Sequence, residues 1–394
     1  MRRFPTSAAL MLALGTLALG TLAGCAFTGA NPGRTYENAA TFDARHEFTV
    51  NVPANTEQLR VWFAMPSDHE PAQRTSDWQV DVSLTTPFLT RTVRDTRGNR
   101  FLLLEAQSPP AGNFQVATTF RLTRKEVRAQ LDPSATRAHT ASELTSLAED
   151  LAPSRMSVID ENARAMARQA VGGETNPILA SRKIYDALLE HMEYHVKDPK
   201  PDAAKTMNST GTGSSLKAFE TRCGNCTDFH SLYAAVSRAA GIPTRVVYGS
   251  FFKGPLDGVD QDQSYHCWIE FHAPKVGWIP LDVAVADVFV ADFRANENSR
   301  PRADLTVANG YQGPNPALVE YYFGNLENRR VTWHYGRDLV MKNPRQAGEP
   351  LLWNPKAYGE ADGESITVGR KLTFTQVIGP RASTASTVNR SSSP

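Results

Sequence analysis

The sequence has no large excess of charge of either sign, no internal repeat and no hydrophobic run long enough to span a bilayer comfortably. Its 394 residues include 42 Lys and Arg against 41 Asp and Glu. This near-neutral balance gives no reason to expect a nucleic-acid partner or a polybasic membrane surface. Nothing in the chain indicates a metal or an organic cofactor. Its length is ample for a sizeable core and suggests two domains.

The N-terminus begins with Met1-Arg2-Arg3 and continues as an apolar run from about Ala8 to Leu22. This run is too short and too rich in small residues for a membrane span, and it is typical of a secretory signal. It ends in Leu22-Ala23-Gly24-Cys25, which resembles the lipobox of bacterial lipoproteins. The alternative is an ordinary cleaved signal followed by an incidental cysteine.

The lipobox resemblance implies a signal peptide at residues 1–24 and lipidation of Cys25. Several acyl chains would hold the protein to a bilayer far better than one. Ala26 stands where lipoproteins kept at the inner membrane often carry Asp, so the outer membrane is favoured. We therefore expect a protein anchored by lipid in the bacterial cell envelope, on the periplasmic face.

The first part of the mature chain is predicted to be a tether followed by a β-rich domain. Residues 25–41 contain Gly, Pro, Asn and Thr and should form a flexible tether. Residues 42–135 show short alternating patterns separated by turn signals, which favour a small β-sandwich. Its expected strands are 47–52, 58–64, 78–84, 101–105 and 114–122. Nothing there clusters titratable residues, so this domain should be a support or docking module.

Helical periodicity begins near residue 141 and marks the start of an α+β core expected at residues 136–345. One apolar stripe follows helical spacing through Ile184, Leu188 and Met192. Residues 198–214 break the pattern and are predicted to be a loop at the rim of the active site. Residues 346–394 are expected to be a C-terminal extension whose last fifteen or so residues are disordered.

A helix is predicted to begin at Cys226. Its buried face follows helical spacing through Phe229, Leu232, Tyr233, Val236 and Ala240. Asn225 is a good N-cap, Asp228 suits the third position, and Gly241 marks the end. Unpaired N–H groups and the positive helix end would then lower the pKa of the Cys226 thiol below about 8.5. The alternative is a small buried thiol at the start of a core helix.

Two strands downstream are predicted to supply partners for this thiol. In the strand at residues 265–271, alternation places His266, Trp268 and Glu270 on one face and Cys267 on the other. The next strand, residues 277–283, would pair antiparallel with it and bring Asp282 beside His266. Although a lone strand histidine is usually structural, a thiol, an imidazole and a carboxylate together are the parts of a nucleophilic triad.

Residues 224–247, 265–271 and 277–282 resemble the bacterial branch of the transglutaminase-like superfamily. Residues 320–338 also resemble its C-terminal core strands, and the likeness weakens after about 346. The resemblance implies a papain-like core, with helices packed on an antiparallel sheet, preceded by the β-sandwich. Motif by motif, it makes Cys226 the nucleophile, His266 the base and Asp282 the orienting acid.

The resemblance further implies a cysteine enzyme that acts on amide bonds through a thioester. The Cys226 thiolate would attack a Gln side chain or a peptide bond of a peptide or protein, and its own backbone N–H would bind the oxyanion. Water or an amine would resolve the acyl-enzyme, so amidase, peptidase and transglutaminase all stay open. The expected partners are such a substrate and, through the lipid anchor, the membrane.

Three other interpretations compete with this one. The fold could serve as a binding or scaffold module without turnover. Cys223 and Cys226 form a C-x-x-C of the kind found in thiol–disulfide oxidoreductases, although the preceding strand of a thioredoxin-like unit is missing. A zinc site built from Cys223, Cys226, His266 and Cys267 is disfavoured because alternation points the last two apart.

Several neighbouring residues have two interpretations. Glu270 shares a face with His266 and could rival Asp282. His230 lies one turn beyond Cys226, where a packing or supporting role is expected. Trp268 and Trp278 either wall the cleft or pack in the core. Oxidation of Cys223 with Cys226 would consume the nucleophile and make the enzyme redox-gated, although Cys223 could instead pair with Cys267.

Overall fold

The computed structural model describes residues 32–195, 212–254, 257–258, 265–290, 312–351 and 356–378. The predicted signal peptide, Cys25, the last fifteen residues and nearly all of the predicted loop at 198–214 lie outside these ranges. Among the described helices, none combines the length and the apolar character that a membrane crossing requires.

Alternating apolar residues build a sandwich of two five-stranded sheets. The first sheet has the order β12-β6-β1-β16, with β3 also paired to β6; the second has the order β15-β14-β2-β5-β4. Their strands are β1 (Arg34–Val52), β2 (Gln58–Ala64), β3 (Gln73–Val82), β4 (Phe88–Arg94), β5 (Arg100–Gln107), β6 (Gly112–Ala129), β12 (Asn325–Leu326), β14 (Ala357–Ala361), β15 (Glu364–Ile366) and β16 (Val368–Gln376).

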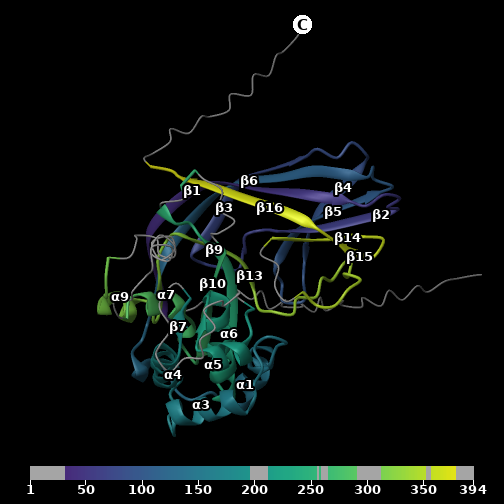
Figure 1. The fold of residues 1–394 in the computed structure, drawn as a ribbon. Coiled ribbons are helices and arrows are strands. Elements are labelled where there is room, and N and C mark those ends of the chain that lie inside the picture. The colour runs from purple at the N-terminus through teal and green to yellow at the C-terminus, as the bar shows by residue number, and fades with distance from the viewer. Residues whose placement is uncertain are drawn as a thin grey trace, which may run out of the picture. The chain divides into compact units, whose positions relative to one another are not determined.

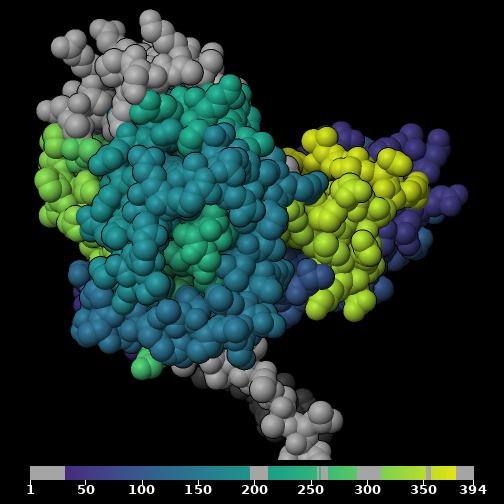
Figure 2. Space-filling view, turned by 90° about the horizontal axis from the view of Figure 1, so that it is seen from below, coloured from purple at the N-terminus to yellow at the C-terminus, as the bar shows by residue number. Residues whose placement is uncertain are grey.

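The sandwich differs from the sequence prediction at both ends. Residues 34–41, expected to be tether, already belong to β1, where residues 34–37 pair with residues 126–129 of β6. The predicted extension supplies three further strands, because β16 pairs along β1 and β14 pairs along β2. Figures 1 and 2 show the yellow C-terminal strands lying against the purple N-terminal ones. Strand β4, which the sequence did not reveal, has six of its seven residues exposed.

The rest of the described chain forms the α+β core that the sequence predicted. Its central sheet is antiparallel with the order β11-β10-β9-β13. The strands are β9 (Thr244–Phe251), β10 (Tyr265–Ala273), β11 (Gly277–Leu281) and β13 (Arg330–Tyr335). Two short strands, β7 (Glu193–Tyr194) and β8 (Cys223–Gly224), form a separate parallel pair.

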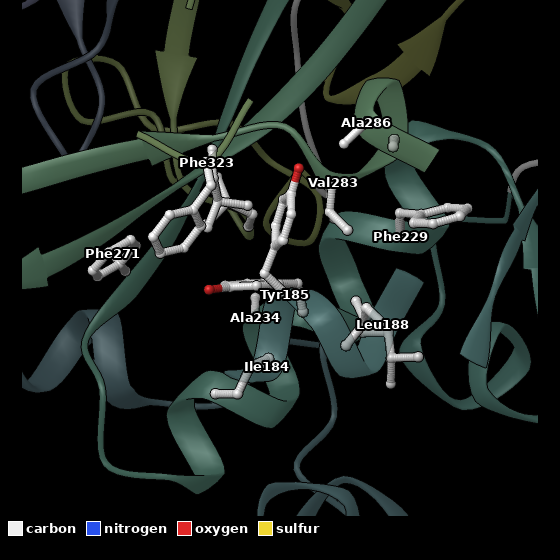
Figure 3. Close-up of a cluster of buried hydrophobic side chains, with 14 of the residues drawn as sticks. Ile184, Tyr185, Leu188, Phe229, Ala234, Phe271, Val283, Ala286 and Phe323 are labelled. Carbon is white, nitrogen blue, oxygen red and sulfur yellow. The ribbon is translucent and has the colours of Figure 1, made fainter. Parts of the chain in front are cut away.

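Helices gather beside this sheet (Figure 1). They are η1 (Pro133–Ala135), α1 (Ala141–Ser146), α2 (Ala148–Leu151), α3 (Glu161–Val171), α4 (Pro177–His191), α5 (Ser215–Thr221), α6 (Cys226–Ala239), α7 (Val283–Val288) and α9 (Pro316–Tyr321). Helix α6 is buried along almost its whole length and packs on β9 and β10. Figure 3 shows the apolar cluster that joins α4, α6 and α7 to β10, with Tyr185, Phe229, Phe271 and Val283 among its members.

The sandwich and the core share buried side chains. Phe42 of β1 and Phe374 of β16 belong to one apolar cluster with Phe252 and Trp333 of the core. The rings of Phe252 and Phe374 stack with their centroids 4.3 Å apart. The C-terminal strand therefore contributes directly to the packing beside β9 and β13.

Candidate active site

Helix α6 begins at Cys226 because its first turn is capped from both sides. The Asn225 side chain accepts hydrogen bonds from the backbone N–H groups of Thr227 and Asp228. In return, Asp228 Oδ2 accepts the Asn225 N–H at 3.0 Å, and its Oδ1 accepts the Gly213 N–H at 2.8 Å. This is the reciprocal capping box of helix starts. The cap uses the amides of residues 227 and 228, not the amide of Cys226.

The chain must approach this cap closely, and Gly224 permits it. A Cβ placed on Gly224 would lie 2.4 Å from the Cβ of Asp228, closer than real side chains come. Any larger residue there would displace Asp228 and the helix start with it. The position of Cys226 is therefore fixed by its neighbours on both sides.

Two side chains of β10 influence the Cys226 thiol. Cys226 is 4% exposed, and its thiol lies close enough to His266 and Cys267 for both to lower its pKa. Strand alternation predicts that His266 and Cys267 point to opposite faces of β10; both nevertheless act on the pKa of the same thiol. Thr227 Oγ1 lies 4.0 Å from the sulfur and 3.5 Å from the hydroxyl of Tyr265.

Asp282 lies beside His266, as the sequence predicts from the pairing of β10 with β11. Ile269 pairs with Leu281, so Asp282 follows directly after the last paired residue of β11. Its Oδ2 lies 2.6 Å from His266 Nε2, and its Oδ1 accepts the Val285 N–H as the N-cap of α7. Because Nε2 faces the carboxylate, Nδ1 is the ring nitrogen left for the thiol.

A buried arginine completes the environment of Asp282. Arg330 Nη1 lies 2.6 Å from the same oxygen, Oδ2, and Arg330 Nε lies 2.6 Å from Oε1 of Glu327. The Arg330 side chain is fully buried and its guanidinium lies over the rings of Phe251 and Trp268. No local pattern distinguishes this residue, since an isolated Arg in a strand is usually a surface charge.

The charges of the site favour a thiolate and an imidazolium. The hydrogen bond from Cys267 is the largest cause that holds the pKa of Cys226 well below its usual value; burial opposes it, and the charge of His266 lowers it further. Burial disfavours the charged imidazole, but Asp282 and the thiolate outweigh it and raise the pKa of His266 to about 9. Burial would also raise the pKa of Asp282, yet His266 and Arg330 hold it well below its usual value.

A second histidine lies behind the thiol. His230 Nδ1 is 3.4 Å from the sulfur of Cys267, and His230 Nε2 is 3.5 Å from Oδ1 of Asp282. His230 and Cys267 are both fully buried. The supporting role expected for His230 fits this placement. Its position one helical turn after Cys226 was the signal in the sequence.

Lys253, which the sequence did not single out, also lies near the nucleophile. It follows the end of β9 and is 9% exposed. Burial lowers its pKa to about 8, and the charge of Cys226 partly opposes that shift. A cation in this position adds to the positive potential at the sulfur.

Glu270, the possible rival of Asp282, is engaged elsewhere. Its Oε1 lies 2.6 Å from Arg34 Nη2, and its Oε2 lies 2.5 Å from Arg245 Nη2. This buried ion cluster attaches the start of β1 to β10. The pKa of Glu270 falls to about 2 because the two guanidinium groups outweigh its burial.

The two tryptophans both serve packing. Trp268 is fully buried, and a Cβ on Gly249 would lie within 2.6 Å of its ring. It therefore does not wall an open cleft. Trp278 is half-buried and stacks on the Arg245 guanidinium, 4.1 Å from its ring centroid.

The cysteines within the described ranges, Cys223, Cys226 and Cys267, are all free thiols. Burial and the nearby Asp228 raise the pKa of Cys223 to about 11. Cys267, and not Cys223, is the thiol that acts on the pKa of Cys226. Within the described residues, no group of three or more His, Cys, Asp or Glu side chains is arranged to hold a metal ion.

Comparison with known proteins places this site within a recognised domain. Residues 164–283 match the model of the transglutaminase-like superfamily. The match includes Cys226, His266 and Asp282. Arg330 lies outside it, on a strand that follows in the chain.

Curated relatives match parts of the chain. An uncharacterized protein of Haemophilus influenzae is 27% identical over 215 residues, which are 50% of this chain and 52% of that protein. A protein-glutamine gamma-glutamyltransferase of Pseudomonas aeruginosa is 38% identical over 69 residues, 16% of this chain and 10% of the enzyme. The chain thus spans about half the length of the first relative and a tenth of the second.

Solved structures match the chain at low identity. A protein of Cytophaga hutchinsonii described as a candidate cysteine protease is 18% identical, with a TM-score of 0.46. The comparison covers 87% of this chain and all of that one. The periplasmic domain of TgpA from Pseudomonas aeruginosa is 17% identical with a TM-score of 0.29, covering 64% of this chain and 92% of that domain.

Proposed function

The chain carries a transglutaminase-like domain, and we propose that this domain is a cysteine acyltransferase or hydrolase that acts on amide bonds of peptides or proteins. The observation that carries the proposal is the buried series Cys226, His266 and Asp282. In this series the imidazole lies 2.6 Å from the carboxylate, and its charge lowers the pKa of the thiol. A thiol, a base and an orienting acid in this order are what nucleophilic catalysis requires.

The proposed reaction begins with the Cys226 thiolate and the His266 imidazolium. The sulfur attacks the carbonyl carbon of a Gln side chain or a peptide bond, and the carbonyl electrons move to the oxygen. The backbone N–H of Cys226 donates to this oxyanion, because the cap leaves that amide unused. The intermediate then collapses, the C–N bond breaks, and the departing amine takes the proton from His266.

The thioester formed in this way is resolved by a second nucleophile. Water, or a primary amine, attacks the acyl carbon while His266 Nδ1 accepts its proton. The C–S bond breaks and the Cys226 thiolate is restored beside the imidazolium. Water yields a carboxylic acid and amounts to hydrolysis, whereas an amine yields a new amide and amounts to transamidation.

Asp282 orients the base throughout this cycle. Its contact with Nε2 keeps Nδ1 turned toward the sulfur, and its charge stabilises the imidazolium. We further propose that the enzyme acts in the cell envelope, held by a lipid on Cys25. The support for that location is the lipobox-like sequence at residues 22–25.

The reaction is tested by incubating the protein with a Gln-containing peptide library, with and without a primary amine, and measuring product masses. A gain of about 1 Da indicates deamidation, a shorter product indicates cleavage, and a larger shift equal to the amine minus ammonia indicates transamidation. If none of these three products forms and Cys226 is shown to be reduced, the result would instead favour a binding module that has no turnover.

The nucleophile is tested with a thiol-directed acylating probe. The Cys226→Ala variant should lose the labelling that the wild-type protein shows. Cys223→Ala is the matched control, because Cys223 is also a buried free thiol three residues away but does not contact His266 or Asp282. Unchanged labelling of Cys226→Ala would overturn the assignment.

A further inference from the structure

The backbone of Asp282 is held from outside the hairpin that leads to it. The ladder between β10 and β11 ends where Ile269 pairs with Leu281. Beyond that point Leu281 forms a bridge with Phe323. The Asp282 N–H donates to the carbonyl oxygen of Tyr322 at 2.9 Å. The carboxylate that orients the proposed base therefore depends on a segment much later in the chain.

Residues 322–326, here called the junction segment, join the core to the sandwich. The N–H of Gly324 donates to the carbonyl oxygen of Pro280 in β11 at 2.9 Å. The carbonyl oxygen of Gly324 accepts the N–H of Ala129 in β6, also at 2.9 Å. The next two residues form β12, which pairs antiparallel with β6. The sheet of the core and the first sheet of the sandwich are thus hydrogen-bonded to the two edges of one short segment.

Buried side chains fix the junction segment on both sides. Phe323 is 3% exposed and meets the ring of Tyr185 on α4 edge to face, with the centroids 5.3 Å apart (Figure 3). Leu326 is 1% exposed and belongs to one cluster with Val127 of β6 and Trp268 of β10. Because protein interiors are close-packed, the segment cannot move without moving these neighbours.

Gly324 is the residue at which the junction segment is most sensitive to substitution. Its φ is +98°, a backbone conformation that residues with a side chain rarely adopt. A Cβ there would also lie 2.8 Å from Cδ2 of Leu131. Even if the Leu131 side chain gives way, Gly324→Ala strains the segment at the point where it contacts both sheets. The substitution removes no side chain from the proposed triad.

We propose that the junction segment is a positioning element for Asp282, which holds the carboxylate in place against the β-sandwich while it orients His266. This inference rests on the proposed function. It gives the sandwich a part in the reaction, because β6 supplies one of the two edges that fix the segment. Displacement of the segment would move Asp282 Oδ2 away from His266 Nε2 and weaken the stabilisation of the imidazolium. A shift of about 1 Å at a reacting group can lower a rate by about 10²-fold.

The charged and titratable groups that face His266 and Asp282 are the same in every variant used below. They are Cys226 and His230 on α6, Cys267 on β10, Arg330 on β13, Tyr185 on α4 and Tyr322 in the junction segment. A change in the titration of His266 therefore reports a change in the position of Asp282.

The test measures the rate at which iodoacetamide alkylates Cys226 as a function of pH, with the modified peptide identified by mass spectrometry. In the wild type the rate should change twice, first as the thiolate forms and again as His266 deprotonates near its pKa of about 9. In Gly324→Ala we expect the second midpoint to fall by about one pH unit, because the hydrogen bond to the charged imidazole is weakened.

Gly363→Ala is the matched control for backbone strain. Gly363 also has a positive φ, +87°, but it lies in the turn between β14 and β15 of the sandwich. A Cβ there would lie 3.5 Å from the Cβ of Ala347, an ordinary contact. The second midpoint of this variant should equal that of the wild type.

Leu326→Ala disturbs the same segment from the side of β6, and its second midpoint should fall by less than that of Gly324→Ala. Leu104→Ala is the control for lost packing, because it removes an equally buried leucine of β5 from a separate cluster of the sandwich. Its free energy of unfolding should fall while its second midpoint stays at the wild-type value. Circular dichroism confirms that each variant is folded before alkylation is measured.

Wild-type second midpoints in folded Gly324→Ala and Leu326→Ala would overturn the inference while leaving the two-step profile, and so the proposed thiolate and imidazolium, intact. An equal fall in Leu104→Ala would also overturn it, because the effect would then follow a general loss of stability. A wild-type profile with a single midpoint near the ordinary thiol value of about 8.5 would overturn the proposed function and, with it, this inference.

Discussion

Arg330 Nη1 lies 2.6 Å from the carboxylate oxygen of Asp282 that faces His266. Glu327, Arg330, Asp282, His266 and Cys226 form a row of alternating charges that ends at the thiolate. Because Arg330 is always protonated and fully buried, it holds a fixed positive charge behind the proposed triad. Its influence on the two titrating members can be measured.

We expect Arg330→Gln to move both limbs of the pH profile of alkylation or turnover to higher pH. Loss of a positive charge makes Cys226 and His266 each hold a proton more tightly. Arg330→Lys keeps the charge and should leave both limbs near their wild-type positions. It should still lower the free energy of unfolding, because the double contact to Glu327 is lost. Identical pH profiles for the two variants would show that the charge of Arg330 does not affect the pKa of Cys226 or of His266.

The wild-type enzyme should be active over a broad range that ends near pH 9. The reacting form needs a Cys226 thiolate, which forms well below the usual thiol range, and a protonated His266, whose pKa is about 9. Activity should therefore be nearly constant at neutral pH and fall as His266 deprotonates. The measurement is kcat/KM against pH. A rate that keeps rising up to pH 10 would indicate an ordinary thiol in place of the ion pair.

Asp282 and Glu270 should differ in what they contribute. Asp282→Asn should lower kcat/KM by about 10²-fold or more, because the imidazole loses its orienting charge. Glu270→Gln should leave both limbs of the pH profile unchanged, because Glu270 contacts Arg34 and Arg245 and not His266. Steady-state kinetics on the two variants decide between them. A large loss of activity in a fully folded Glu270→Gln protein would contradict the assignment.

Glu270 should instead appear in the acid stability of the protein. Its pKa is about 2 in the folded state against about 4.5 when unfolded, so the unfolded chain binds more protons between these values. Its stabilising contribution is present above pH 4.5 and is lost as the pH falls toward 2. The free energy of unfolding, measured with urea at pH 3, 4, 5 and 7, should therefore fall more steeply with decreasing pH in the wild type than in Glu270→Gln. Equal slopes would exclude this linkage.

The C-terminal strand should be essential to the stability of the fold. Phe374 is 1% exposed and stacks on Phe252, so Phe374→Ala should lower the free energy of unfolding by about 3–5 kcal/mol. Ile378→Ala, four residues later, is the control, because Ile378 is 92% exposed and should change little. Denaturant unfolding curves measure both. Equal stability of the two variants would mean that β16 packs only loosely.

The features that local sequence patterns encode were predicted well. The cap at Asn225, the helix behind Cys226 and the pairing that brings Asp282 to His266 each depend on residues close together in the sequence. The α+β class and the β-sandwich are likewise confirmed by the structure. Such features need only helical or strand periodicity and a turn between two neighbouring strands.

The features that were missed depend on distant partners. The sequence after 346 predicts only an extension, because nothing local shows that β16 completes a sheet begun by β1. Alternation gave the direction of Cys267 but not the position of the helix that it faces. Arg330 is distinguished from a surface charge only by its burial against Asp282. Each of these required the three-dimensional arrangement of segments far apart in the chain.

Strand β1 has one consequence for how the polypeptide is made. Its partner β16 lies more than 300 residues later, with Phe42 opposite Gln376 and Val50 opposite Val368. Closing so long a loop is entropically costly and gives the chain a high contact order, which slows folding. During synthesis the edge of β1 that pairs with β16 stays unpaired until β16 has been made. An open strand edge is a template for association with other chains. The nascent protein is therefore most vulnerable to aggregation just before β16 emerges.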